Sequence, residues 1–146
     1  MTEQPTTLFE LVEVRGEQRS QQRLFTYLVD GETSEAHMTY GELAARCRAI
    51  GSAIAERTSA GDRALLLYPP GLEYVEAFFA CQHAGVIAVP AYPPNPAALE
   101  RTLPRLVAIM QSSGASLILT TSAVAEMARQ FLADLPEFHS ARWLAK

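Results

Sequence analysis

Short apolar runs alternate with helical patterns through the second half of the chain, and this alternation constrains the fold most. Runs rich in apolar residues cover 64–68, 86–91 and 116–120, and residues 141–145 can begin a fourth. Such runs are typical of strands covered on both faces. Strands that alternate with helices predict right-handed crossovers and a parallel sheet. We therefore predict an open, mainly parallel α/β sheet with flanking helices over residues 62–146.

The segments between these runs carry helical patterns. Residues 72–84 are apolar nearly all round, which predicts a buried helix. Apolar residues recur at helical spacing over 99–110, where Pro104 is expected to kink the helix or restart it near Thr102. Ser122 is expected to cap the last helix.

The first part of the chain predicts a helix and a small β-hairpin ahead of the sheet. Two Thr-x-x-Glu capping boxes, at 7–10 and 39–42, predict the starts of two helices, the first a short one whose apolar side runs up to Gly16. Between them, strand-forming residues at 23–29 and 36–39 flank an Asp-Gly turn.

Length and charge exclude several classes of protein. A chain of 146 residues predicts one domain, and 49% hydrophobic residues can build its core. The net charge of −4 provides no basic field for nucleic acid. No apolar run is long enough to span a membrane, and residues 1–7 contain no apolar signal core, so we expect a cytoplasmic protein.

The residue pattern predicts no catalytic, cofactor-binding or metal-binding residue. The glycines are scattered, so no phosphate-binding loop is recognisable. Cys47 and Cys81 lack a C-x-x-C spacing and are expected to be buried, reduced thiols. Ser112 and Ser113 are more consistent with helix capping than with nucleophilic catalysis.

Structural roles also explain the histidines and the acid pair better than catalytic roles do. His83 stands near a helix end, where its ring can interact with the last carbonyls, and a structural role is favoured over a catalytic one. His37 and His139 are expected at the surface. Glu73 and Glu76 have the spacing of an acid pair, but a solvated helix face explains them better.

The proline-rich segment 91–96 follows a predicted strand and leaves two interpretations open. Ligands of open α/β sheets bind beyond the carboxyl ends of strands, so the segment can form a rigid wall of a site. It can also be a stiff crossover that only aims the next helix, which residue chemistry alone favours.

Several motifs resemble those of adenylate-forming enzymes. Residues 38–43 (Met-Thr-Tyr-Gly-Glu-Leu) resemble the first core motif, Leu-Ser/Thr-Tyr-x-Glu-Leu, with Met38 in place of leucine. Residues 84–90 resemble the second motif, an Ala-Gly pair leading into a strand that ends in proline. Residues 61–74, 77–81 and 89–94, the last with its Tyr-Pro-Pro ending, resemble the fatty-acyl-AMP ligase branch. The resemblance extends from about residue 7 to residue 145.

This resemblance implies a parent enzyme that uses ATP and Mg²⁺ to convert a fatty acid to acyl-AMP and pyrophosphate. The acyl group then passes to an acyl carrier protein, in lipid or polyketide biosynthesis. The chain corresponds to the N-terminal portion of the enzyme's large domain. The phosphate loop, acyl tunnel and catalytic lysine of the family would lie beyond Lys146, so this segment alone is expected to be inactive and to bind no cofactor.

The expected partners of the segment are the rest of the large domain or, through an open sheet edge, a second copy. Alternatives are a fragment of an acyl-CoA synthetase or of an amino-acid adenylation domain, or a non-enzymatic α/β interaction module.

Overall fold

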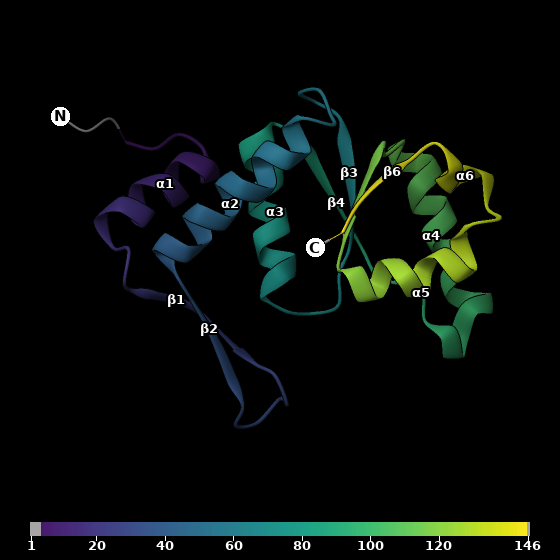
Figure 1. The fold of residues 1–146 in the computed structure, drawn as a ribbon, viewed down its shortest axis with the longest axis horizontal. Helices are drawn as coiled ribbons and strands as arrows, with labels where there is room; N and C mark the ends of the chain where they lie inside the picture. The colour runs from purple at the N-terminus through teal and green to yellow at the C-terminus, as the bar shows by residue number, and fades with distance from the viewer. Residues whose placement is uncertain (1–3, 146) are drawn as a thin grey trace.

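A computed structural model describes residues 4–145, in which a helix and a hairpin precede an α/β sheet (Figure 1). In chain order the elements are α1 (Leu8–Gln18), β1 (Arg23–Leu28), β2 (Glu35–Thr39), α2 (Tyr40–Ala55), β3 (Arg63–Leu67), α3 (Leu72–Ala84), β4 (Ile87–Ala91), the 3₁₀ turn η1 (Pro96–Ala98), α4 (Leu99–Ser113), β5 (Leu117–Thr120), α5 (Ser122–Leu132), α6 (Pro136–His139) and β6 (Arg142–Ala145).

Both predicted capping boxes are confirmed. In α2 the backbone N–H of Glu42 donates to Thr39 Oγ1 at 3.2 Å, and the N–H of Thr39 donates to Glu42 Oε2 at 2.8 Å. Thr7 and Glu10 make the same reciprocal pair at the start of α1. Each box satisfies two N–H groups that a helix start would otherwise leave free.

The predicted short first helix is present, and α1 continues past Gly16 to Gln18. Gly16 is a point of close approach between helices. A Cβ there would lie 2.6 Å from the Cβ of Ala44 in α2. Tertiary packing therefore explains this glycine better than helix termination does.

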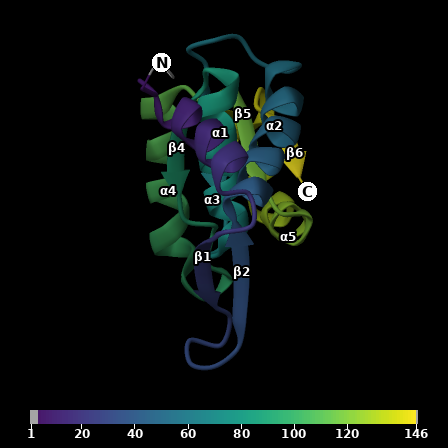
Figure 2. The same cartoon turned by 90° about the vertical axis from the view of Figure 1, so that its left-hand side faces the viewer.

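The hairpin β1–β2 is antiparallel, as predicted, and projects away from the rest of the molecule (Figures 1 and 2). Asp30 shapes its turn by accepting the backbone N–H groups of Glu32, Thr33 and Ser34, each at 2.9 Å. These hydrogen bonds hold the pKa of Asp30 well below its usual range. The base of the hairpin packs against α1 and α2 through Leu24, Phe25 and Met38.

The second half of the chain forms a four-stranded parallel sheet in the order β4-β3-β5-β6, which confirms the prediction. The predicted strand ranges differ from the observed ones by about one residue at an end. Residues 64–67 of the central strand β3 are fully buried. The edge strand β4 contains Pro90, which cannot donate a ladder hydrogen bond.

Helices cover both faces of this sheet. On one face, Leu66 and Leu119 pack with α2 and α3 in a cluster that includes Ile54 and Ala77. On the other face, alternate residues such as Leu65 and Ile118 pack with α4, α5 and α6. Burial on both faces explains why these strands appear as continuous apolar runs in the sequence.

Two predicted details of the later helices are wrong. Of the two outcomes expected for Pro104, a restart near Thr102 is wrong, because α4 begins at Leu99 and continues through the proline. Burial of Leu106 and Met110 against the sheet offsets the one hydrogen bond that proline cannot donate. The N-cap of α5 is Thr121 rather than Ser122, because Val124 N–H donates to Thr121 Oγ1 at 3.2 Å.

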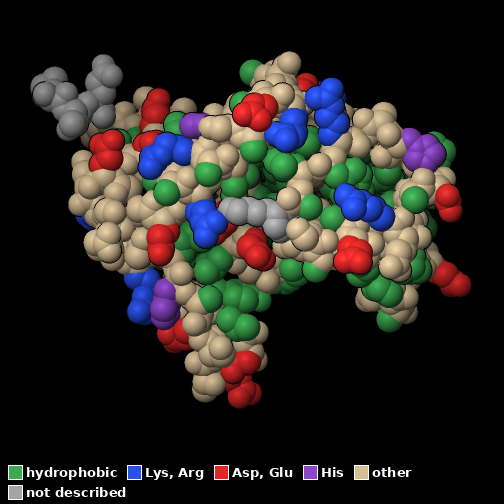
Figure 3. Space-filling view, viewed as in Figure 1, with side chains coloured by type: hydrophobic (Ala, Val, Ile, Leu, Met, Phe, Trp, Pro, Cys, Tyr) green, Lys and Arg blue, Asp and Glu red, His purple; other side chains and the backbone are tan. Residues whose placement is uncertain are grey.

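The surface mixes charges of both signs. Figure 3 shows acidic and basic side chains interspersed over one face. Among residues 4–145, every helix is too short or too polar to cross a lipid bilayer.

Candidate functional site

The chain order of the strands reverses beside β3. The next strand, β4, lies on one side of β3, whereas β5 and β6 lie on the other. In open α/β sheets, ligands bind beyond the carboxyl ends of the strands at such a reversal. The residues that follow β3, β4 and β5 are therefore the candidate site.

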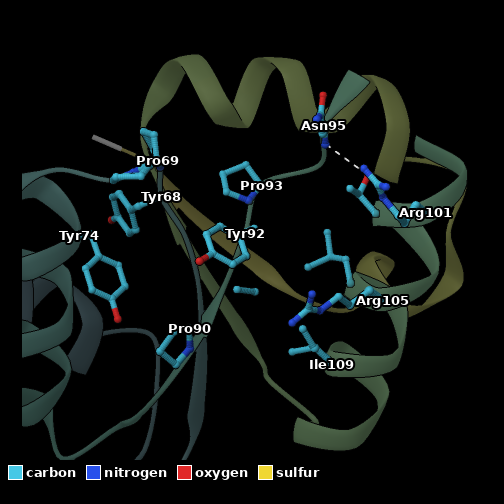
Figure 4. Close-up of a pocket in the computed structure, with 14 residues that line it drawn as sticks. Tyr68, Pro69, Tyr74, Pro90, Tyr92, Pro93, Asn95, Arg101, Arg105 and Ile109 are labelled. Atoms are coloured by element: carbon cyan, nitrogen blue, oxygen red, sulfur yellow. Dashed lines mark hydrogen bonds between the residues drawn. The ribbon is translucent and has the colours of Figure 1, made fainter. Parts of the chain in front are cut away.

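The larger of two hollows at this edge, which we call the tyrosine groove, has a volume of about 700 Å³. Tyr68 after β3, Tyr74 of α3 and Tyr92 after β4 form one side (Figure 4). The first turns of α4 form the opposite side, with Arg101 and Arg105. Aromatic and aliphatic walls with a few charged groups are typical of small-molecule sites.

The proline-rich segment contributes to this groove and also directs α4. Pro93 and Asn95 line the groove together with Tyr92. The N–H of Asn95 donates to Thr102 Oγ1 at 3.3 Å, and Asn95 Oδ1 accepts the N–H of Ala97 at 3.0 Å. The segment therefore combines the two roles that the sequence left as alternatives, a rigid wall and a crossover that aims the next helix.

The second hollow, which we call the acidic hollow, has a volume of about 410 Å³. It lies between α2, α3 and the ends of β5 and β6, and it shares Tyr68 with the tyrosine groove. Glu73 and Glu76 line it together with Arg46, whose Nε lies 3.9 Å from Glu76 Oε1. Leu119 and Leu144 add an apolar floor from the sheet.

The prediction of a solvated face for both glutamates is wrong for Glu76. Glu73 is exposed, but Glu76 is only 9% exposed. Glu76 faces Arg46 of α2, and the close packing of α2 on α3 removes most of its contact with water. Sequence spacing alone does not reveal which side of α3 meets α2.

Tyr68 lines both hollows and is half-buried. Burial raises the pKa of its phenol, and the nearby Cys81, Glu73 and Glu76 raise it further. At neutral pH the group is therefore an uncharged hydroxyl that can donate a hydrogen bond.

His83 has the structural placement expected of it, but packing replaces the expected hydrogen bond. Its ring meets Phe9 edge-on with the centroids 4.6 Å apart, and Gly51 lies against it. Within the described residues, its buried Nδ1 has no hydrogen-bond partner. His37 and His139 are exposed, as predicted. His37 contacts Thr26 and Glu35, and His139 contacts the carbonyl of Ala133.

The cysteines are buried, unpaired thiols, as predicted. Burial raises the pKa of both Cys47 and Cys81 to about 12, so neither is an activated nucleophile. Ser113 caps locally, since its hydroxyl accepts the N–H of Ala115 at 3.3 Å. Within residues 4–145, no group of three or more His, Cys, Asp or Glu side chains is placed to share a metal ion.

Sequence reasoning missed the two arginines of the groove. Arg101 and Arg105 are spaced i, i+4, which places both on one side of α4. That spacing is visible in the sequence, but only the fold shows that this side faces three tyrosines across a hollow.

Comparison with protein families gives a match over most of the chain. The profile of the family described as AMP-binding enzyme matches residues 13–142. Among curated proteins, the medium-chain fatty acid–acyl-carrier-protein ligase JamA of Moorena producens is 39% identical over 140 residues. The match covers 95% of this chain and 24% of JamA.

Solved structures share the fold. The fatty acid AMP ligase of Legionella pneumophila superposes with a TM-score of 0.82 and 33% identity, over 97% of this chain and 23% of that one. The fatty acyl-adenylate ligase of L. pneumophila in complex with acyl adenylate and pyrophosphate gives a TM-score of 0.79 and 31% identity, with the same coverage. The chain thus spans about a quarter of the length of these proteins.

Proposed function

The chain belongs to the AMP-binding enzyme family, and from this premise we propose that it is the N-terminal part of an adenylate-forming fatty-acid ligase. The observation that carries the proposal is the match to fatty-acid ligases over 95% or more of the chain at 33% and 39% identity. Residues 1–146 would form the beginning of a large domain, with the α/β unit at about 62–146.

The proposed reaction has two steps. A carboxylate oxygen of the fatty acid attacks the α-phosphorus of ATP, the bond to the β-phosphate oxygen breaks, and acyl-AMP and pyrophosphate form. A carrier-protein thiolate then attacks the acyl carbonyl, a thioester forms and AMP leaves. The pyrophosphate and acyl adenylate named for the L. pneumophila complex and the acceptor named for JamA support these steps. Mg²⁺ would neutralise the phosphate charge.

Within this reaction, the motif residues of this chain would serve as scaffold. The motif residues Thr39 and Glu42 cap a helix, and Gly85 ends one in a left-handed conformation. Pro90 lies next to last in the edge strand β4. None of these roles requires contact with ATP, and we propose that the 146-residue chain alone does not adenylate.

The experiment that tests the proposal uses the longer protein that contains this chain. It is incubated with ATP, Mg²⁺, labelled octanoate, and either a carrier protein or excess CoA. We expect acyl-AMP, a loaded carrier and little acyl-CoA. Efficient acyl-CoA synthesis would assign the protein to the acyl-CoA synthetases, and adenylation of amino acids alone would remove it from both groups.

A parallel assay addresses the chain itself. Pyrophosphate exchange with octanoate should remain at the level of a buffer control. Turnover that copurifies with the 146-residue chain would contradict its role as scaffold. If the longer protein adenylates no acid at all, the alternative of a non-enzymatic interaction module gains support.

A further inference from the structure

The tyrosine groove has one cationic side and one aromatic side. Arg101 and Arg105 come from one side of α4, and Tyr68, Tyr74 and Tyr92 come from the strand ends and α3 (Figure 4). Ile109 lies one turn beyond Arg105 and extends the apolar surface under it. A ligand that fits this arrangement needs an anionic end and an apolar body.

The two guanidinium groups lack an internal counter-charge. Within residues 4–145, no carboxylate lies within ion-pair distance of Arg101 or Arg105. Like charges at i, i+4 on a helix repel each other, so an anion between them is stabilised by both. Arginine is also the side chain that matches a carboxylate in a two-pronged hydrogen bond.

The aromatic side is rigid and open to ligands. Tyr92 is 76% exposed, although large apolar rings are usually at least partly covered. Pro93 and Pro94 follow it directly and restrict its backbone. A ligand that packs on this ring therefore costs little additional backbone entropy. The groove volume of about 700 Å³ lies within the range that small ligands occupy.

We propose that the tyrosine groove binds a fatty carboxylate, with the carboxylate on Arg101 and Arg105 and the alkyl chain on Tyr92, Tyr68 and Ile109. The class of ligand rests on the proposed function, whereas the position rests on the groove itself. The site contains no group for adenylation and would hold the acid without reacting with it.

Calorimetric titration of the 146-residue chain with octanoate tests the proposal. We expect saturable binding that falls at least about tenfold in the double variant R101Q/R105Q, because its charge-assisted hydrogen bonds are lost. Arg129→Gln is the matched control, since it removes an exposed arginine of α5 outside the groove and should leave the affinity unchanged. Tyr92→Ala removes the exposed aromatic surface and should also weaken binding. Circular dichroism verifies that each variant is folded.

Other ligands test the contributions of the anionic group and of the alkyl chain separately. Octylamine and 1-octanol have the same alkyl length without the anion and should bind at least about tenfold more weakly than octanoate. Inorganic phosphate should also bind more weakly, since it lacks an alkyl chain. Equal affinity for octylamine, equal affinity for phosphate, an unaffected R101Q/R105Q variant, or no octanoate binding would each overturn the proposal. None of these results depends on turnover, so failure here is distinct from failure of the ligase assay.

Discussion

Replacement of Gly51 by alanine tests whether helix propensity or tertiary packing decides stability at this position. Gly51 lies in the interior of α2 and is buried against the ring of His83. Helix propensity alone predicts that alanine stabilises such a position by about 1 kcal/mol. The structure predicts instead that alanine lowers the free energy of unfolding.

The magnitude follows from the contacts. A Cβ at Gly51 would overlap the His83 Cδ2 and lie 2.8 Å from Cγ and 2.9 Å from Cβ of the same residue. Because the His83 Cβ is itself too close, ring rotation cannot relieve the overlap, and α2 and α3 must separate. Overpacking costs up to about 3 kcal/mol. After the propensity gain, a net loss of about 2 kcal/mol in the free energy of unfolding remains, or about 4–8 °C in Tm for a chain of this length.

Thermal and urea unfolding, followed by circular dichroism, measure this loss. Ala45→Gly, at an exposed position of the same helix, is the control that gives the propensity contribution alone. In the double variant G51A/H83A, the ring contacts are absent, so the loss should be smaller than the sum of the single losses by at least about 0.5 kcal/mol. A G51A protein as stable as the parent, or more stable, would refute the packing argument.

Three further predictions concern caps, thiols and assembly. Thr39→Ala should lower stability by about 1 kcal/mol in urea unfolding, because Glu42 N–H loses its acceptor. Equal stability of T39A and the parent would contradict this. The pKa of Glu42 is lowered chiefly by the backbone N–H of Thr39, which alanine keeps, so the stability linked to this carboxylate is present above its unfolded pKa and is lost as pH falls through its folded value in both proteins. Cys47 and Cys81 should resist Ellman's reagent at pH 8 until the chain unfolds. Rapid labelling of the folded chain would refute this protection. Since burial raises the pKa of both thiols to about 12, the free energy of unfolding should fall from about pH 9 upward. The free edge of β6 should favour dimers or larger species in light scattering, and a strict monomer at high concentration would count against pairing.

The sequence predicted the elements well because their signals are local. A capping box needs only Thr39 and Glu42, and a strand buried on both faces appears as a continuous apolar run such as 64–67. The parallel sheet followed from the alternation of strands and helices, and the family resemblance followed from motifs within single segments.

The candidate site could not be predicted in this way. Its two sides come from segments that are separated along the chain, and Arg101 and Tyr68 line one groove only because β3, β4 and α4 bring them to one edge of the sheet. The burial of Glu76 likewise depends on the side of α3 against which α2 packs.

The chain's own sequence determined which segments become helices and strands, because capping, apolar periodicity and backbone restriction act over a few residues. The tertiary structure alone decided what several residues do there. Gly16 and Gly51 are points of close contact between helices, and Pro104 is accommodated within α4. In each case the outcome depends on the free energy of packing against a distant segment, which the local sequence does not contain.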